Sequence, residues 1–151
     1  MLKNILNTSA VVQIGFVVSD IERAARDFAD MLGLDAPAAF RTGPPEEART
    51  VFRGAPSGAR AKLAFLNVGP NLAIELIEPD NEPSTWREEL DARGEGVHHI
   101  AFQIKGMGEK IAALESAGLP LLQTGEYPGG RYAYVDARSA VKTIIELLEN
   151  D

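Results

Sequence analysis

The alternation of hydrophobic and polar positions predicts strands and helices in turn along the chain. Residues 11–18 form a mostly β-branched apolar run, which is typical of a buried strand. Ser19 is followed three residues later by Glu22, and this capping-box spacing predicts that a helix begins there. Apolar residues then recur at helical spacing up to Gly33, a residue type that commonly ends helices. The pattern therefore starts with a buried strand and an amphipathic helix.

A turn-rich segment and a hairpin complete the first half. Residues 35–60 carry most of the turn formers, so we expect a long loop with one strand near 50–53. Residues 62–68 and 71–77 are two further strand-like segments, and the Gly-Pro pair between them predicts a hairpin turn. The first half thus reads as βαβββ.

The second half repeats this order after a polar connector. A short helix is expected within the connector at 84–91. The other expected elements are a helix at 108–117 and strands at 97–104, 121–124, 131–135 and 143–148.

Short sequence matches indicate that the two halves are copies of one module. The segment QIGFVV at 13–18 aligns with HIAFQI at 99–104, and IELIE at 74–78 aligns with IELLE at 145–149. We therefore predict an α+β fold in which two βαβββ modules form a cup-shaped mixed sheet, with the first and last strands of each module at its floor. The predicted boundaries are a single domain at 1–151, a first module at 9–80, a connector at 81–96 and a second module at 97–151.

Composition and charge narrow the function classes. The 151 residues include 22 acidic and 15 basic side chains, for a net charge of -7, and such a surface repels phosphate backbones. The absence of cysteine excludes thiolate catalysis, disulfides and cysteine zinc sites. No apolar run approaches the ~20 residues of a membrane span, and residues 1–10 do not resemble a signal peptide. We expect a cytoplasmic protein that acts on a small molecule and has no nucleic-acid or membrane partner.

Four polar residues interrupt apolar strands at matching positions of the two modules. Gln13 in the first strand corresponds to His99, and Glu75 in the last strand corresponds to Glu146. Burying an unpaired carboxylate is costly, so two buried glutamates need a cation or hydrogen-bond donors. The repeat would bring the four side chains to one point, which predicts a metal site with the ligands Gln13, Glu75, His99 and Glu146. Taken singly, a glutamate in a strand more often faces solvent, a lone histidine is more often structural than a ligand, and glutamine is an uncommon metal ligand.

The donor set predicts the kind of ion and the kind of reaction. One nitrogen and three oxygen donors suit one divalent metal ion, such as Zn, Co, Ni, Mn or Mg. A six-coordinate ion would keep two positions for a substrate with neighbouring oxygens, whose enolate it would stabilise. A glutamate displaced by that substrate would take the α-proton, so Glu146 and Glu75 are the candidate catalytic residues.

Basic and aromatic side chains supply candidates for substrate binding. Five of the 15 basic residues fall within 41–62, and this segment is either an anion-receiving rim or a solvated loop: Arg41, Arg49, Arg53, Arg60 and Lys62. The candidate substrate-binding residues are Arg53, Lys62, Arg131 and Tyr132. Strand alternation places His98 on the face opposite His99, so we expect His98 to be structural or at most an indirect support of the site.

Two segments carry a family resemblance: GEGVHHIAF at 94–102, and the hairpin from LNVG at 66–69 to IELIEP at 74–79. Both resemble segments of methylmalonyl-CoA epimerases in the vicinal oxygen chelate (glyoxalase/bleomycin resistance/dioxygenase) superfamily. The resemblance covers nearly the whole chain and implies metal binding at the four positions and a homodimer. These epimerases usually have histidine where this chain has Gln13, and the set of glutamine, glutamate, histidine and glutamate resembles glyoxalase I instead. Val17 and Pro79 stand where glyoxalase I has an arginine and an asparagine, so glutathione recognition is poorly supported.

Three functions remain open at this point. The leading one is a divalent-metal-dependent isomerase or epimerase that stabilises an enolate, with an acyl-CoA or hydroxycarbonyl substrate and methylmalonyl-CoA as the nearest family example. Its base would be Glu146, with Glu75 or a loop glutamate such as Glu46 or Glu47. The alternatives are a glyoxalase I-like lyase and a metal-free small-molecule-binding protein of the same fold. Extradiol dioxygenase chemistry is excluded because the only two histidines are adjacent and expected on opposite faces.

Overall fold

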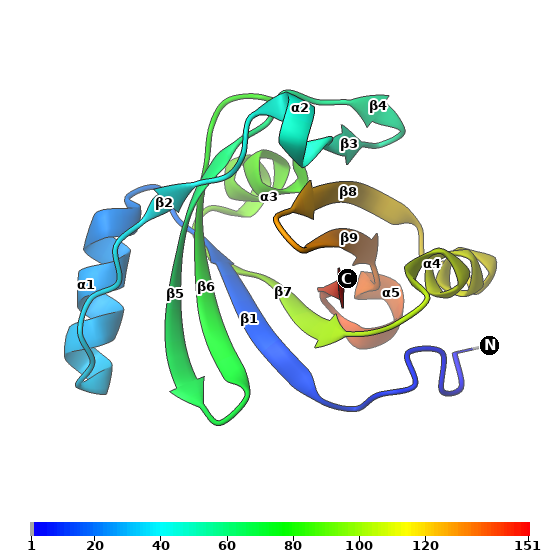
Figure 1. Cartoon of the computed structure of the whole chain (residues 1–151), viewed down its shortest axis with the longest axis horizontal. Coiled ribbons are helices and arrows are strands. Elements are labelled where there is room, and N and C mark those ends of the chain that lie inside the picture. The colour runs from blue at the N-terminus through cyan, green and yellow to red at the C-terminus, as the bar shows by residue number, and fades with distance from the viewer. Residues whose placement is uncertain (1) are drawn as a thin grey trace.

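The computed structural model describes residues 2–151, which form one ten-stranded sheet curled into a cup (Figure 1). The first half contains β1 (Val11–Val17), α1 (Ile21–Leu32), β2 (Phe40–Arg41), α2 (Pro45–Ala48), β3 (Val51–Phe52), β4 (Ala55–Pro56), β5 (Ala61–Gly69) and β6 (Leu72–Pro79). The connector helix and the second half are α3 (Thr85–Arg93), β7 (Gly96–Gln103), α4 (Met107–Ser116), β8 (Leu121–Tyr127), β9 (Gly130–Asp136), α5 (Arg138–Val141) and β10 (Ile144–Asn150). The predicted α+β fold with a cup-shaped mixed sheet is confirmed.

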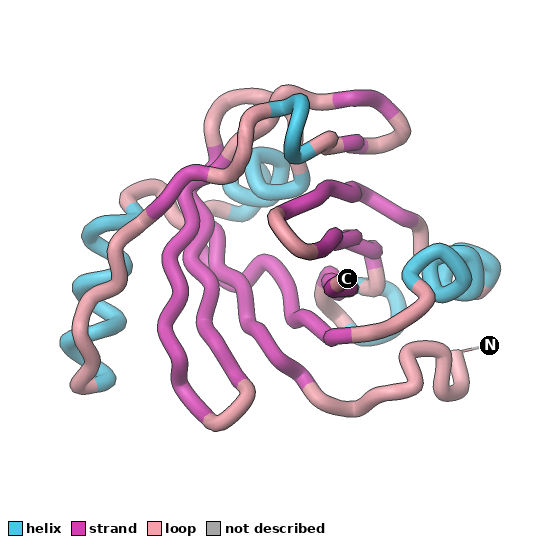
Figure 2. Tube along the Cα trace, viewed as in Figure 1, coloured by secondary structure: helices cyan, strands magenta, loops and turns pink. Residues whose placement is uncertain are grey.

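The central strands follow the symmetry of the repeat. The order across the sheet is β2-β5-β6-β1-β7-β10-β9-β8-β3-β4. β1 and β7 run antiparallel in the middle, and each pairs in parallel with the last strand of its own half, β6 or β10. The first and last strands of each half therefore lie side by side at the floor of the cup, as predicted (Figure 2).

Alternating side chains give the strands an outer face for a helix and an inner face for the cup. On β5, Ala64 and Leu66 are buried in one cluster with Ile21 of α1. Leu63 and Phe65 alternate with these two residues along β5, so their side chains point to the inner face of the sheet, where they line a cavity inside the cup. α4 packs in the same manner against β9 and β10. Because the helices cover the outer faces, the inner faces are free to form a binding site.

The start of α1 differs from the prediction in one detail. Its N-cap is Asp20 rather than Ser19, and the Asp20 side chain accepts a hydrogen bond from the Arg23 N–H at 3.1 Å. Ser19 instead donates its backbone N–H and its hydroxyl to Glu95 Oε1, each at 2.8 Å. Serine and aspartate are comparable N-caps, so the sequence favours neither of two neighbours. The helix ends as predicted, at Gly33 with φ of 70°.

The long segment after α1 crosses from one edge of the sheet to the other. β2 pairs with β5 at the first edge, whereas β3 pairs with β4 and β8 at the second (Figure 1). The strand expected near 50–53 therefore exists, but it extends the sheet beyond the second half rather than completing the first. Residues 40–43 and 46–50 line the cavity, so the crossing segment builds part of the cup wall.

The helices are short. α1 is 12 residues long, and within residues 2–151 we find no helix with the length and apolar character needed to cross a membrane.

The sequence did not predict the short helix α5, which begins at Arg138. The guanidinium group of Arg138 lies between the carboxylates of Asp136 and Glu89, each at 2.7 Å from one of its nitrogens. The pair between Arg138 and Glu89 joins the connector helix α3 to the second half.

Candidate metal centre

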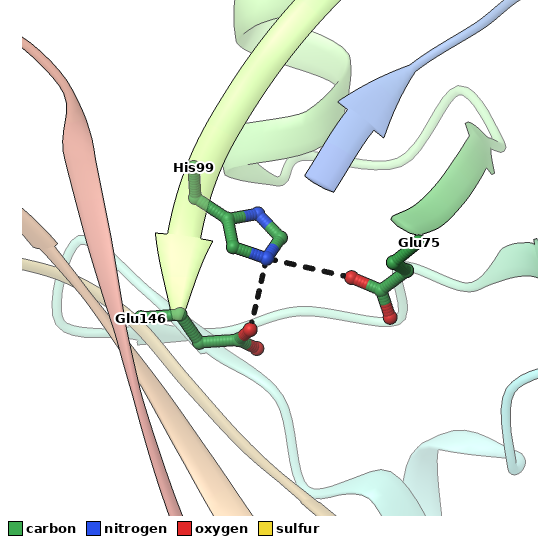
Figure 3. A group of neighbouring side chains, drawn as sticks. All are labelled: Glu75, His99 and Glu146. Carbon is green, nitrogen blue, oxygen red and sulfur yellow. Dashed lines mark ion pairs between the residues drawn. The ribbon is translucent and has the colours of Figure 1, made fainter. Parts of the chain in front are cut away.

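Four polar side chains from the four central strands meet at the floor of the cup. Gln13 lies on β1, Glu75 on β6, His99 on β7 and Glu146 on β10. Glu75, His99 and Glu146 are buried, and one ligand atom of each lies within 4.8 Å of those of the others (Figure 3). The parallel and antiparallel pairings of these strands thus bring together residues that are up to 133 positions apart, from Gln13 to Glu146.

His99 Nε2 lies between the other donors. It is 2.9 Å from Glu146 Oε2 and 3.5 Å from Glu75 Oε1 (Figure 3). The Gln13 amide atom that faces the cluster is 3.0 Å from the same nitrogen, 2.8 Å from Glu146 Oε2 and 3.2 Å from Glu75 Oε1. The structure therefore places all four predicted ligands around one small volume.

The Gln13 amide fits this volume in either of two orientations. With its nitrogen inward, the amide donates hydrogen bonds to both carboxylates. With its oxygen inward and His99 Nε2 unprotonated, four acceptor atoms face one another, and a cation between them would relieve this arrangement. One imidazole nitrogen and three oxygens suit a borderline or hard divalent ion, so the donor set fits the predicted metal.

Burial sets the protonation of the cluster. It raises the pKa of Glu146 to about 8, although a hydrogen bond with Tyr134 acts in the opposite direction. Burial, and then the charge of Glu146, raises the pKa of Glu75 well above its ordinary value. Burial also lowers the pKa of His99 to about 3. The imidazole is consequently neutral near pH 7, as ligation requires, and a cation would offset the cost of ionising the two buried glutamates.

A glycine makes room for the imidazole. Gly15 on β1 lies directly opposite His99 on β7, and a Cβ at this position would overlap the His99 ring. Glycine is needed here for close approach of a strand to a side chain. A larger residue at position 15 would push His99 away from the other donors.

A β-bulge in β7 changes the direction of His98. Gly15 pairs with His99 but Phe16 pairs with Val97, so His98 is an extra residue on β7. The prediction that His98 faces away from His99 is therefore wrong. The two Nδ1 atoms lie 2.9 Å apart, and Val97 takes the outward position with 59% of its surface exposed.

The cluster opens into a cavity of about 990 Å³. Much of its wall is aromatic or aliphatic: Phe40, Leu63, Phe65, Trp86, Tyr132 and Leu148. The crossing segment adds two carboxylates from α2, Glu46 and Glu47, and two cations, Arg41 and Arg49. A mostly apolar cavity of this volume with a few polar groups is typical of a small-molecule site.

The four predicted substrate-binding residues separate into two groups. Tyr132 lines the cavity, and its hydroxyl accepts a hydrogen bond from Gln123 Nε2 at 2.9 Å. The other three lie outside the cavity lining and are held in ion pairs with acidic side chains: Arg53 with Glu88, Lys62 with Glu78, and Arg131 with Asp151. The cations of the wall, Arg41 and Arg49, come from the same basic segment, but residue spacing in a loop gives no signal for which side chains face inward.

Comparison with known proteins identifies the family. A family model described as the Glyoxalase/Bleomycin resistance protein/Dioxygenase superfamily matches residues 12–135. The chain is a member of this superfamily. Its membership agrees with the curled sheet and with the resemblance seen in the sequence.

Individual members of the superfamily match over different lengths. The uncharacterized protein YqjC of Bacillus subtilis (strain 168) is 30% identical over 95 residues, which cover 60% of this chain and 66% of YqjC, slightly under two thirds. The crystal structure of hypothetical protein BH1468 from Bacillus halodurans C-125 has a TM-score of 0.64 and 25% identity, covering 94% of each chain. Methylmalonyl-CoA epimerase from Mycobacterium tuberculosis has a TM-score of 0.64 and 23% identity, covering 100% of this chain and 93% of the epimerase. The likeness to the epimerase shows that the two proteins share a fold.

Proposed function

We propose that this superfamily member is a divalent-metal-dependent isomerase or epimerase that acts through an enolate, with an acyl-CoA such as methylmalonyl-CoA as substrate. The observation that supports this function is the convergence of Gln13, Glu75, His99 and Glu146 at the floor of the cavity. The substrate candidate comes from the epimerase that shares the fold. A homodimer remains a prediction from the family resemblance.

The proposed reaction divides the work between the ion and the chain. A bound divalent ion would act as a Lewis acid that favours the enolate form of the substrate. Glu75 and Glu146 reach the cavity from its floor, whereas Glu46 and Glu47 belong to α2 in its wall. Epimerisation removes a proton from one face of a carbon and returns it to the other, so carboxylates on different elements suit it. We assign proton transfer to Glu146, with Glu75, Glu46 or Glu47 as the second group.

Exchange of the substrate α-proton tests this function. One C2 epimer of methylmalonyl-CoA is incubated in heavy water with protein loaded with Zn²⁺ or Co²⁺, and the α-proton and methyl signals are followed by NMR. We expect the α-proton signal to disappear and the methyl doublet to collapse. Exchange no faster than with the free ion, in protein shown to carry metal, would overturn the epimerase assignment.

A glyoxalase I-like lyase is the second candidate because its donor set is the same as the one assembled here. The hemithioacetal of methylglyoxal and glutathione, given to the same metal-loaded protein, tests this reaction. A metal-free binding protein is the third candidate, since the Gln13 amide nitrogen can satisfy both carboxylates without an ion. It predicts ligand binding that a chelator does not change.

Arg41 is expected to bind the phosphate groups of a CoA substrate at the cavity rim. It lies on β2 opposite Lys62, lines the cavity and is exposed. We expect Arg41→Ala to raise KM for methylmalonyl-CoA about 10-fold with little change in kcat, since one charge-assisted contact contributes roughly 1.4 kcal/mol. Arg53→Ala is the matched control because Arg53 lies outside the lining and pairs with Glu88. Equal effects of the two substitutions would contradict a specific role for Arg41.

A further inference from the structure

The β-bulge in β7 builds a series of hydrogen-bonding groups behind the metal ligand. His98 Nδ1 lies 2.9 Å from His99 Nδ1, and His98 Nε2 lies 3.1 Å from the Thr85 hydroxyl. All three side chains are buried, with 3% exposure or less. We propose that His98 and Thr85 are positioning residues that select the ring tautomer of His99, and we call these three residues the relay. The proposal rests on the proposed metal centre and adds a role for residues behind it.

The ring protons of His98 and His99 can be placed in two ways. Two ring nitrogens at hydrogen-bond distance share one proton, so the tautomer of one ring determines that of the other. When His99 Nε2 carries its proton, it donates to Glu146 Oε2, and His99 Nδ1 must accept from His98 Nδ1–H. When His99 Nε2 is a metal ligand, His99 Nδ1–H donates to His98 Nδ1, and His98 Nε2–H points to Thr85. Each ring keeps one proton in both arrangements and exchanges it through water, so the rings release none.

Thr85 is suited to the end of this relay because a hydroxyl both donates and accepts. In the first arrangement it donates to His98 Nε2, and in the second it accepts from it. Thr85 is the first residue of α3, and its backbone N–H donates to the buried Gln123 Oε1 at 2.9 Å, which fixes its position. The Tyr134 ring packs edge-on against His98 at 4.9 Å between centroids and fixes the other side.

Two substitutions of nearly the same size separate the relay from simple packing. In His98→Asn the side-chain oxygen takes the place of Nδ1 and still accepts from His99. In His98→Gln the side-chain amide takes the place of Nε2, so the hydrogen bond to His99 Nδ1 is lost. We expect His98→Asn to bind Zn²⁺ within about 3-fold of the wild type, and His98→Gln to bind it about 10–100-fold more weakly, as is usual when the partner of a metal-ligating histidine is lost. Thr85→Val, with Thr85→Ser as its conservative partner, tests the other end if either His98 variant fails to fold.

Nitrogen NMR of the histidine rings reads the tautomers directly, in protein treated with chelator and again with excess Zn²⁺. We expect protons on His98 Nδ1 and His99 Nε2 before Zn²⁺ is added, and on His98 Nε2 and His99 Nδ1 afterwards. A His98 tautomer that does not change when Zn²⁺ binds, or equal affinities of His98→Asn and His98→Gln, would overturn the relay. If the wild type binds no Zn²⁺, the metal centre fails, while a proton on His98 Nδ1 in the chelator-treated protein still supports the relay and one on Nε2 refutes it.

Discussion

Replacing Gly15 by alanine is expected to abolish tight metal binding although it removes no ligand. The added methyl group would overlap the His99 ring, which lies between the other three donors. The ring must move, and we expect the affinity for Zn²⁺ to fall more than ~100-fold, beyond the usual effect of losing an indirect contact. Overpacking of the buried β1–β7 pair should also lower the free energy of unfolding by about 1–3 kcal/mol. Titration with Zn²⁺ and denaturant unfolding measure the two effects.

Gly108→Ala is the matched control for this substitution. Gly108 lies in the first turn of α4, and a Cβ there has no neighbour within 4 Å. We expect it to leave the Zn²⁺ affinity unchanged and to stabilise the protein by up to about 1 kcal/mol, because alanine favours helix. A Zn²⁺ affinity of Gly15→Ala equal to that of the wild type would contradict the position of the His99 ring between the other three donors.

Glu146→Gln is expected to affect metal binding and stability in opposite directions. Loss of a charged ligand should weaken Zn²⁺ binding more than ~100-fold, since even indirect partners cost 10–100-fold. Without metal, burial raises the pKa of Glu146 to about 8, so folding near pH 7 must protonate this carboxyl group, and an isosteric amide avoids that cost. The chelator-treated variant should therefore be more stable than the wild type near pH 7, by about 1–4 kcal/mol, because a carboxyl group whose pKa is raised on folding destabilises the folded state at a pH above its ordinary pKa.

Thermal unfolding with and without metal measures this reversal. At a Zn²⁺ concentration of about 100 times Kd, the wild type should gain roughly 2.7 kcal/mol, or about 5–11 °C in Tm. The variant should gain almost nothing at the same concentration. Glu126→Gln is the control, because Glu126 lines the outer cavity and pairs with the exposed Arg49. A metal-free variant that is less stable than the wild type would contradict a desolvation cost at the site.

The convergence of the four candidate metal ligands could be predicted because strand alternation and an internal repeat act together. A glutamate in a strand is usually exposed, but Glu75 and Glu146 occupy equivalent places in two copies of one module, as do Gln13 and His99. The first and last strands of the two modules pair with one another at the centre of the sheet. Residues at equivalent positions of these strands therefore lie close together.

The features that could not be predicted depend on register and on loops. One extra residue in β7 turns His98 toward His99, and nothing in the local sequence marks the bulge. The position of the strand near 50–53 depends on a long crossing segment that pairs with the far edge of the sheet. Charge alone also did not distinguish Arg41, which lines the cavity, from Arg53, which pairs with Glu88 on α3. These contacts are all between segments distant in sequence.

Elemental analysis measures whether the four side chains at the floor of the cup hold a metal ion. The wild type and Glu146→Ala are incubated with Zn²⁺, Co²⁺, Ni²⁺ or Mn²⁺, dialysed together and analysed. We expect about one divalent ion per wild-type chain and almost none in the variant, as is usual for a folded site with four protein ligands. A wild type that retains no ion, or a variant that retains as much as the wild type, would contradict a metal centre formed by Gln13, Glu75, His99 and Glu146.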